Sequence, residues 1–95
     1  MKNPAVYIMT NKRNGALYTG VTSTLIQRVF QHKNGITTGF THRYKCKWLV
    51  YYEFFADMEH AILREKRIKA GSRKQKLKLI ESINPEWIDL YESIF

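Results

Sequence analysis

The sequence predicts an α+β fold in which helices cover a small β-sheet. Two short apolar runs joined by a turn signal open the chain, which indicates an antiparallel hairpin. A third run, rich in aromatic and β-branched residues, lies in mid-chain, and three segments carry apolar stripes at helical spacing. The resulting order of elements is ββαβαα, which favours one sheet covered by helices.

Length and composition limit the class of protein. The chain has 95 residues, 44% apolar and 14% aromatic, so we expect one domain over residues 1–95. Its apolar runs are too short to span a bilayer, and the N-terminus is not apolar enough for a secretory signal. Cys46 is the only cysteine, which excludes an internal disulfide and a thiolate zinc site. We therefore expect a cytoplasmic location and no membrane partner.

The predicted hairpin joins residues 6–9 to residues 16–19 through Asn14-Gly15, because both of these residues tolerate positive φ. Side chains alternate between the two faces of a strand. Tyr7 and Tyr18 therefore project from the same face whenever the hairpin loop has an even number of residues.

The first helix is predicted over Leu25–Lys33. Thr24 and Gln27 have the spacing of a capping box, and Asn34-Gly35 supplies a C-terminal stop. On this helix one face combines apolar and polar side chains at positions i, i+3, i+4 and i+7, namely Leu25, Arg28, Val29 and His32. The arginine and the histidine are therefore expected to be neighbours.

Residues 35–45 are rich in glycine and threonine and are interpreted as a mobile loop carrying His42, Arg43 and Lys45. The following segment, residues 47–55, has the aromatic and β-branched content of a central strand.

Asp57 is the predicted cap of a second helix that runs to about Ala70 and ends at Gly71. Its apolar stripe includes one carboxylate, at Glu65. The members of this stripe are Met58, Ala61, Ile62, Glu65 and Ile68. A carboxylate on an apolar face is costly unless it is paired or binds a cation, so both possibilities stay open.

A third helix, Arg73–Ile83, is predicted to begin at a capping box formed by Ser72 and Gln75. Asn84-Pro85 breaks it, and a short final turn follows. The residues expected to be buried in the helix are Leu77, Ile80 and Ile83, and the turn is expected to pass through Trp87 and Leu90.

Basic residues outnumber acidic ones by 16 to 8, giving a net charge of +8. Half of the basic residues lie within residues 64–78. Such a concentration of positive charge is typical of a protein that binds a phosphate backbone. A solvated helical face is the structural alternative. The residues predicted to bind nucleic acid are Arg43, Lys45, Lys66, Lys69, Arg73 and Lys74.

Five polar side chains are expected on faces that turn inward: Tyr7, Tyr18, Arg28, His32 and Glu65. Taken singly, each has a structural interpretation, such as sheet packing, bracing of a loop or an ion pair. Together they supply what phosphodiester hydrolysis requires. A carboxylate can anchor a hard divalent ion, a guanidinium can hold the phosphate, and a phenol or imidazole can accept a proton from water.

These residues resemble the GIY-YIG nuclease superfamily over roughly residues 4–85. Ala5-Val6-Tyr7 is similar to its Gly-Ile-Tyr triplet, and Tyr18-Thr19-Gly20 to its Tyr-Ile-Gly triplet. The segment "TGVTSTLIQRVFQHKNG" resembles the helix that carries the family arginine and histidine, and "EHAILREKRIKAG" the helix that carries the metal-binding glutamate. The most similar members are small, single-domain and YhbQ-like. Three positions depart from the family pattern. Ala5 stands in place of glycine, Thr19 in place of isoleucine, and Leu77 in place of a family asparagine.

The resemblance implies a three-stranded antiparallel sheet flanked by helices and one Mg²⁺ or Mn²⁺ ion held by Glu65. It implies that Tyr7 is the general base, although the residues alone leave the choice between Tyr7 and Tyr18 open. Tyr18, Arg28 and His32 would position the phosphate or assist proton transfer.

The function we expect is metal-dependent cleavage of DNA, with branched or damaged DNA among the substrates. A nucleic-acid-binding module without catalysis is the first alternative, and a protein-interaction scaffold that uses the aromatic strand is the second. DNA is the expected partner. The sequence leaves open whether a protein partner targets the domain to DNA and whether the protein is a monomer or a weak dimer.

Overall fold

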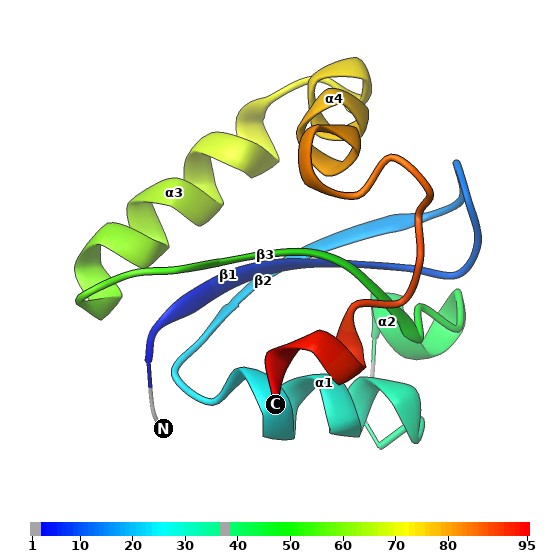
Figure 1. The fold of residues 1–95 in the computed structure, drawn as a ribbon, viewed down its shortest axis with the longest axis horizontal. Helices are drawn as coiled ribbons and strands as arrows, with labels where there is room; N and C mark the ends of the chain where they lie inside the picture. The colour runs from blue at the N-terminus through cyan, green and yellow to red at the C-terminus, as the bar shows by residue number, and fades with distance from the viewer. Residues whose placement is uncertain (1–2, 37–38) are drawn as a thin grey trace.

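The computed structural model describes residues 3–36 and 39–95. One antiparallel sheet of three strands, β1 (Ala5–Thr10), β2 (Leu17–Thr22) and β3 (Trp48–Phe54), has the order β2-β1-β3. Helices lie on both of its faces (Figure 1). The predicted α+β class and the three-stranded antiparallel sheet are therefore confirmed.

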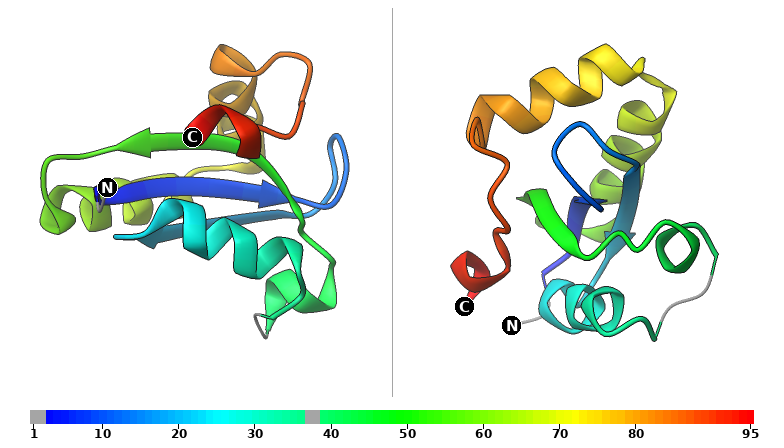
Figure 2. Two further views of the ribbon diagram at one scale, coloured as in Figure 1. Left: turned by 60° about the horizontal axis from the view of Figure 1, so that its bottom comes forward. Right: turned by 90° about the vertical axis from the view of Figure 1, so that its right-hand side faces the viewer.

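Five helical segments surround the sheet, and the views in Figure 2 show α1 on one side of it and α3 with α4 on the other. The predicted bounds of α1, α3 and α4 are confirmed, whereas α2 lies inside the predicted loop. Their bounds are α1 Leu25–Lys33, α2 Phe40–Arg43, α3 Met58–Ala70, α4 Arg73–Ile83 and the 3₁₀ helix η1 Tyr91–Ile94. None of these helices is long and apolar enough to cross a membrane within the described part of the chain.

All six residues of β1 are buried, so the strand contributes to a hydrophobic cluster on each face of the sheet. Toward α3 and α4 the buried residues are Val6, Ile8, Val50, Tyr51, Ala61, Ile68, Ile80 and Trp87. Toward α1 they are Ala5, Tyr7, Met9, Leu25, Val29, Cys46 and Leu49. The alternation along β1 therefore decides that Tyr7 faces α1.

The hairpin register confirms that the two tyrosines share a face. Thr10 pairs with Leu17, so the loop between them, residues 11–16, has an even number of residues. Met9 pairs with Tyr18. Because Met9 and Tyr7 are two positions apart on one strand, Tyr18 lies on the side of Tyr7. In the loop Asn14 has a φ of 58°, as expected for a residue that tolerates the left-handed region.

The prediction of a central mid-chain strand is wrong, because β3 pairs only with β1 and forms an edge of the sheet. The central position belongs to β1, which is apolar on both faces. The two ends of β3, Trp48 and Phe54, are 41% and 48% exposed. Its aromatic residues therefore reflect a strand that is only partly covered.

Helix ends follow the predicted signals except at the start of α1. Asp57 accepts a hydrogen bond from the His60 amide, and the Ser72 capping box at α4 is complete. Thr24 makes no side-chain cap; its hydroxyl lies 3.4 Å from the Thr22 hydroxyl, which also accepts a hydrogen bond from the Thr24 amide at 3.0 Å. The stop after α1 is confirmed by Gly35, whose φ is 66° and whose amide donates to a carbonyl of the helix.

Three further local predictions are wrong. In the segment interpreted as a loop, residues 40–43 form the single turn α2, which buries Thr41, while residues 37 and 38 lie outside the described residues. Ile83 is 54% exposed, because it lies at the end of α4 where no element covers it. The final helical turn begins only at Tyr91, and the preceding Trp87 is a buried residue with a φ of 56°.

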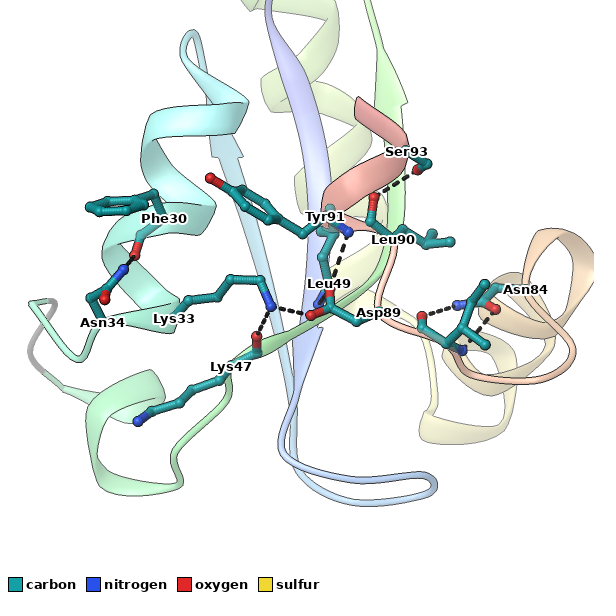
Figure 3. Close-up of polar contacts among 11 residues, drawn as sticks. Phe30, Lys33, Asn34, Lys47, Leu49, Asn84, Asp89, Leu90, Tyr91 and Ser93 are labelled. Atoms are coloured by element: carbon teal, nitrogen blue, oxygen red, sulfur yellow. Dashed lines mark hydrogen bonds and ion pairs between the residues drawn. The ribbon is translucent and has the colours of Figure 1, made fainter. Parts of the chain in front are cut away.

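The segment after α4 returns along β3 and fastens α1 to the sheet (Figure 3). The Asp89 carboxylate accepts hydrogen bonds from the amides of Leu49 at 3.2 Å and Tyr91 at 3.1 Å, and it also pairs with the Lys33 ammonium. The Leu90 amide donates to the Leu49 carbonyl at 2.7 Å. One carboxylate thus joins α1, β3 and η1.

We expect Asp89→Ala to lower the free energy of unfolding by about 2 kcal/mol, because it leaves two amides without their acceptor and breaks the ion pair with Lys33, whose ammonium keeps its bond to the Lys47 carbonyl. Urea unfolding measures this loss. The exposed Glu92→Ala is the matched control and should cost less than about 0.5 kcal/mol. Equal losses in both variants would show that the carboxylate of Asp89 does not anchor the segment.

Candidate active site

Four of the five predicted catalytic side chains come from the elements on the α1 side of the sheet. Tyr7 comes from β1, Tyr18 from β2, and Arg28 and His32 from α1. The Tyr7 hydroxyl and His32 Nε2 are 2.9 Å apart and hydrogen bonded. The His32 ring centroid lies 5.6 Å from both tyrosine rings, which are 6.2 Å from each other.

Gly20 provides the space for the phenol of Tyr7, with which it pairs across β1 and β2. A Cβ placed on Gly20 would lie 2.6 Å from the Tyr7 hydroxyl oxygen and 2.6 Å from its Cζ, closer than van der Waals contact allows. Glycine at this position therefore lets the phenol lie across β2.

Tyr7 is 1% exposed, and this burial raises the pKa of its phenol to about 12, although the nearby Arg28 guanidinium acts in the opposite direction. Tyr7 is therefore protonated near neutral pH. In contrast, burial first and the Arg28 charge second lower the pKa of His32 to about 4. The imidazole is therefore neutral and able to accept or donate a proton.

Arg28 is half-buried and contacts the Tyr7 hydroxyl. Its contact with the Tyr7 hydroxyl is the main cause that raises the pKa of the guanidinium, which stays charged. Its Nη1 also donates to Gln31 Oε1 at 3.3 Å. A fixed cation beside two phenols and an imidazole is suited to hold an anionic group.

Two aromatic residues that we did not predict extend the cluster. Phe40 of α2 stacks on Tyr18 with ring centroids 6.3 Å apart, and Tyr44 lies 4.6 Å from Phe40. Both are 43% exposed. The only signal in the sequence was their aromatic character within a glycine- and threonine-rich stretch, since four helical residues are too few to show periodicity.

A small cavity of about 130 Å³ opens beside His32 on the same side of the sheet. Two lysines on its wall, Lys45 and Lys47, are exposed. Lys45 was among the predicted nucleic-acid ligands, and Arg43 lies nearby, with its guanidinium 5.6 Å from the Tyr44 ring. This side of the protein is therefore positively charged around the tyrosine cluster.

Glu65 is not brought into hydrogen-bond contact with the other four residues. It lies on α3, whose apolar stripe packs on the opposite face of the sheet. Its side chain is 14% exposed, and within the described chain its polar contact is an ion pair with Lys69 at 2.9 Å. Of the two possibilities for Glu65, pairing with a basic residue or binding a cation, the structure contains the pairing.

The other predicted nucleic-acid ligands on α3 and α4 differ in their availability. Lys66 and Lys74 are exposed, whereas Lys69 is paired with Glu65. The Arg73 guanidinium donates to the carbonyl oxygens of Asn14 and Gly15 at 2.7 Å, and so ties the hairpin loop to α4.

The residues present fit a metal ion that keeps most of its waters. No group of three or more His, Cys, Asp or Glu side chains that could hold a metal occurs among residues 3–36 and 39–95, so a cage of protein ligands is not formed. One carboxylate, Glu65, suits a hard divalent ion, which commonly binds through one or two carboxylates, waters and phosphate oxygens.

The structure is thus a small three-stranded α+β domain that groups two tyrosines, a histidine and an arginine. Residues 3–78 match the family model described as the GIY-YIG catalytic domain, and the chain belongs to the GIY-YIG family. Domains of this family are generally endonucleases, act on nucleic acid and use divalent metal ions.

Several relatives are UPF0213 proteins. That of Staphylococcus haemolyticus is 42% identical over 76 residues, covering 80% of this chain and 92% of the relative. That of Clostridium perfringens is 43% identical over 77 residues, covering 81% and 82%. The solution NMR structure of the UPF0213 protein BH0048 from Bacillus halodurans is similar, with a TM-score of 0.59, 29% identity and 92% coverage of both chains.

We expect Gly20→Ala to displace the Tyr7 phenol and to lower the free energy of unfolding by about 1–3 kcal/mol, because overpacking forces strain. Urea unfolding measures the loss, and NMR of the His32 ring follows the Tyr7–His32 hydrogen bond. In a Tyr7→Ala background the same change should cost much less. A full loss in that background would show that Gly20 is required for another reason.

We expect acid to destabilise the protein through His32. Above pH 6.5 both the folded and the unfolded imidazole are neutral, so the group has no effect there. As the pH falls from 6.5 toward about 4, only the unfolded state takes up the proton, and stability is lost. Urea unfolding should show a loss of about 1–2 kcal/mol between about pH 7 and pH 5. His32→Gln should flatten this profile, and an unchanged slope would contradict the assignment.

Proposed function

We propose that the protein is a metal-dependent endonuclease that hydrolyses phosphodiester bonds in DNA, with branched or damaged DNA among its substrates. The observation that carries the proposal is the Tyr7–His32 hydrogen bond beside Arg28 in a chain that matches a catalytic domain. The chemistry of these side chains supports the residue roles derived below.

Arg28 binds the scissile phosphate. Its guanidinium is charged at all relevant pH values, is only partly buried and is fixed by Gln31 and the Tyr7 hydroxyl. Charge that develops on the phosphoryl oxygens is therefore met by a cation that does not need to move. Tyr18 is partly exposed and orients the phosphate from the β2 side.

Tyr7 and His32 move the proton. A phenol with a pKa of about 12 holds its proton near neutral pH, so it cannot act alone as a base. His32 Nε2, 2.9 Å away, can accept that proton once a bound phosphate offsets the Arg28 charge that lowers the pKa of the imidazole, while the Tyr7 oxygen takes a proton from the attacking water. The water oxygen then forms the new bond to phosphorus, and the leaving oxygen departs from the opposite side. This assigns the general-base role to Tyr7 with His32 as its acceptor.

Glu65 would hold the Mg²⁺ or Mn²⁺ ion at the β2 edge of the sheet, because α3 contacts β2 and the Tyr7 phenol lies over Gly20 of the same strand. A bound divalent ion neutralises charge on the phosphate and lowers the pKa of a coordinated water. The ion pair that now occupies the carboxylate involves Lys69, whose side chain is 51% exposed. Such a partly exposed pair stabilises the fold by less than about 1 kcal/mol, so exchange of the lysine for a cation is inexpensive.

A non-catalytic nucleic-acid-binding module is the second candidate. The Glu65–Lys69 ion pair favours it, because it satisfies the carboxylate without a metal. Both functions share DNA as partner and the cytoplasm as location, and both allow a targeting protein and a monomer or weak dimer. They differ only in whether a metal ion starts cleavage.

Glu65→Gln should reduce metal-dependent cleavage by at least about 100-fold, since it removes the only acidic ligand proposed for the ion. Cleavage of linear, nicked, flapped and four-way DNA with Mg²⁺ or Mn²⁺ is measured beside DNA binding in the absence of metal. Glu59→Gln, an exposed change of equal charge in the first turn of α3, is the control and should keep full activity.

Binding without any metal-dependent cleavage by the wild-type protein would instead establish the non-catalytic module. Equal cleavage by wild-type protein and the Glu65→Gln variant would reject Glu65 as the metal ligand.

A further inference from the structure

A cavity of about 250 Å³ is lined by residues of α3 and α4, the helices that cover the face of the sheet opposite α1 (Figure 1). Arg64 and Arg67 of α3 and Lys76 of α4 line it, with Ile68 and Leu79 as its apolar wall. None of the described residues in its lining is acidic. A concave surface with three cations is a site of positive potential that the proposed catalytic chemistry does not use.

Arg64 is held in place from the side of the sheet. Its Nε donates to Glu53 Oε1 at 3.0 Å, and the Tyr51 hydroxyl donates to the same carboxylate at 3.2 Å. The contact with Tyr51 is also the main cause of the raised pKa of the guanidinium. Two residues of β3 therefore fix the arginine in the wall of the cavity, so little side-chain freedom is lost on binding an anion.

The charge in the cavity exceeds what this network neutralises. Glu53 balances Arg64, whereas Arg67 is exposed and Lys76 is half-buried. Two positive charges therefore stay available to a ligand. The volume is below the roughly 300–1,000 Å³ typical of sites for drug-sized ligands, so the cavity suits one small anionic group and not a whole cofactor.

We propose that the cavity between α3 and α4 binds a backbone phosphate of the nucleic acid, at a subsite separate from the tyrosine cluster. Arg67 and Lys76 contact the phosphate, and Arg64 forms the fixed part of the site. The chain measures 30 × 28 × 25 Å, and phosphates recur about every 3.4 Å along one strand. A strand that follows the surface from one side of the protein to the other therefore needs more than roughly nine nucleotides.

The subsite rests on the proposed nucleic-acid substrate but not on cleavage, because binding is measured on the wild-type protein without divalent metal. In the first arm, inorganic phosphate is titrated while NMR follows the amides of Gly71, Gln75 and Lys76. These signals should shift with phosphate, and the double variant Arg67→Gln/Lys76→Gln should weaken this response by at least about 10-fold. The control Lys12→Gln/Lys78→Gln removes the same charge from exposed positions outside the cavity and should keep the response.

In the second arm, DNA affinity is measured against salt concentration. The cavity variant should lower the slope of log affinity against log salt by about 1, because the one phosphate contact that it loses contributes about 0.9. A phosphate response with an unchanged DNA slope would show that the cavity binds free phosphate, which overturns the assignment to nucleic acid. The absence of any phosphate response in the folded wild-type protein would overturn the site itself.

Thermal unfolding verifies that both double variants are folded. The single variant Arg67→Gln changes one exposed residue, and its phosphate response is measured as well, in case the double variant does not fold. A loss of cleavage in Glu65→Gln with an intact phosphate response supports the cavity separately from catalysis. Wild-type protein that binds phosphate here but cuts no DNA would reject the proposed enzyme and keep this subsite.

Discussion

The complete burial of β1 is the constraint on which the structure depends. This strand has all six residues buried, pairs with β2 on one edge and β3 on the other, and contributes to the clusters on both faces. Strands buried on both faces are fixed in register, because a shift by one residue exchanges the two faces. Here such a shift would move Tyr7 from the α1 side to the α3 side and separate it from His32.

The α1 face is organised around one polar contact within an apolar cluster. Tyr7 and His32 are both nearly inaccessible to water, and each satisfies the hydrogen-bonding need of the other. Burial raises the pKa of the phenol and lowers that of the imidazole. Near neutral pH the Tyr7 phenol therefore keeps its proton, and the His32 imidazole is neutral. The C-terminal segment stabilises this arrangement from outside, because Asp89 joins the end of α1 to β3.

The sheet divides the cationic surface into two parts. Lys45 and Lys47 line the small cavity beside His32, while Arg64, Arg67 and Lys76 line the larger cavity between α3 and α4. Some basic residues have structural contacts as well, since Arg73 ties the hairpin loop to α4 and Lys69 pairs with Glu65. Counting lysines and arginines along the chain cannot separate these roles, because each depends on what lies next to the side chain in space.

The sequence by itself determined the features that depend on residues close together in the chain. The helix limits at α1, α3 and α4, the capping box at Ser72 and the shared face of Tyr7 and Tyr18 follow from capping residues, periodicity and loop parity. Only tertiary structure decided that β1 is central, that Phe40 stacks on Tyr18, and that Glu65 lies on the helix across the sheet, paired with Lys69. These features depend on contacts between segments far apart in the chain, which periodicity and spacing do not encode.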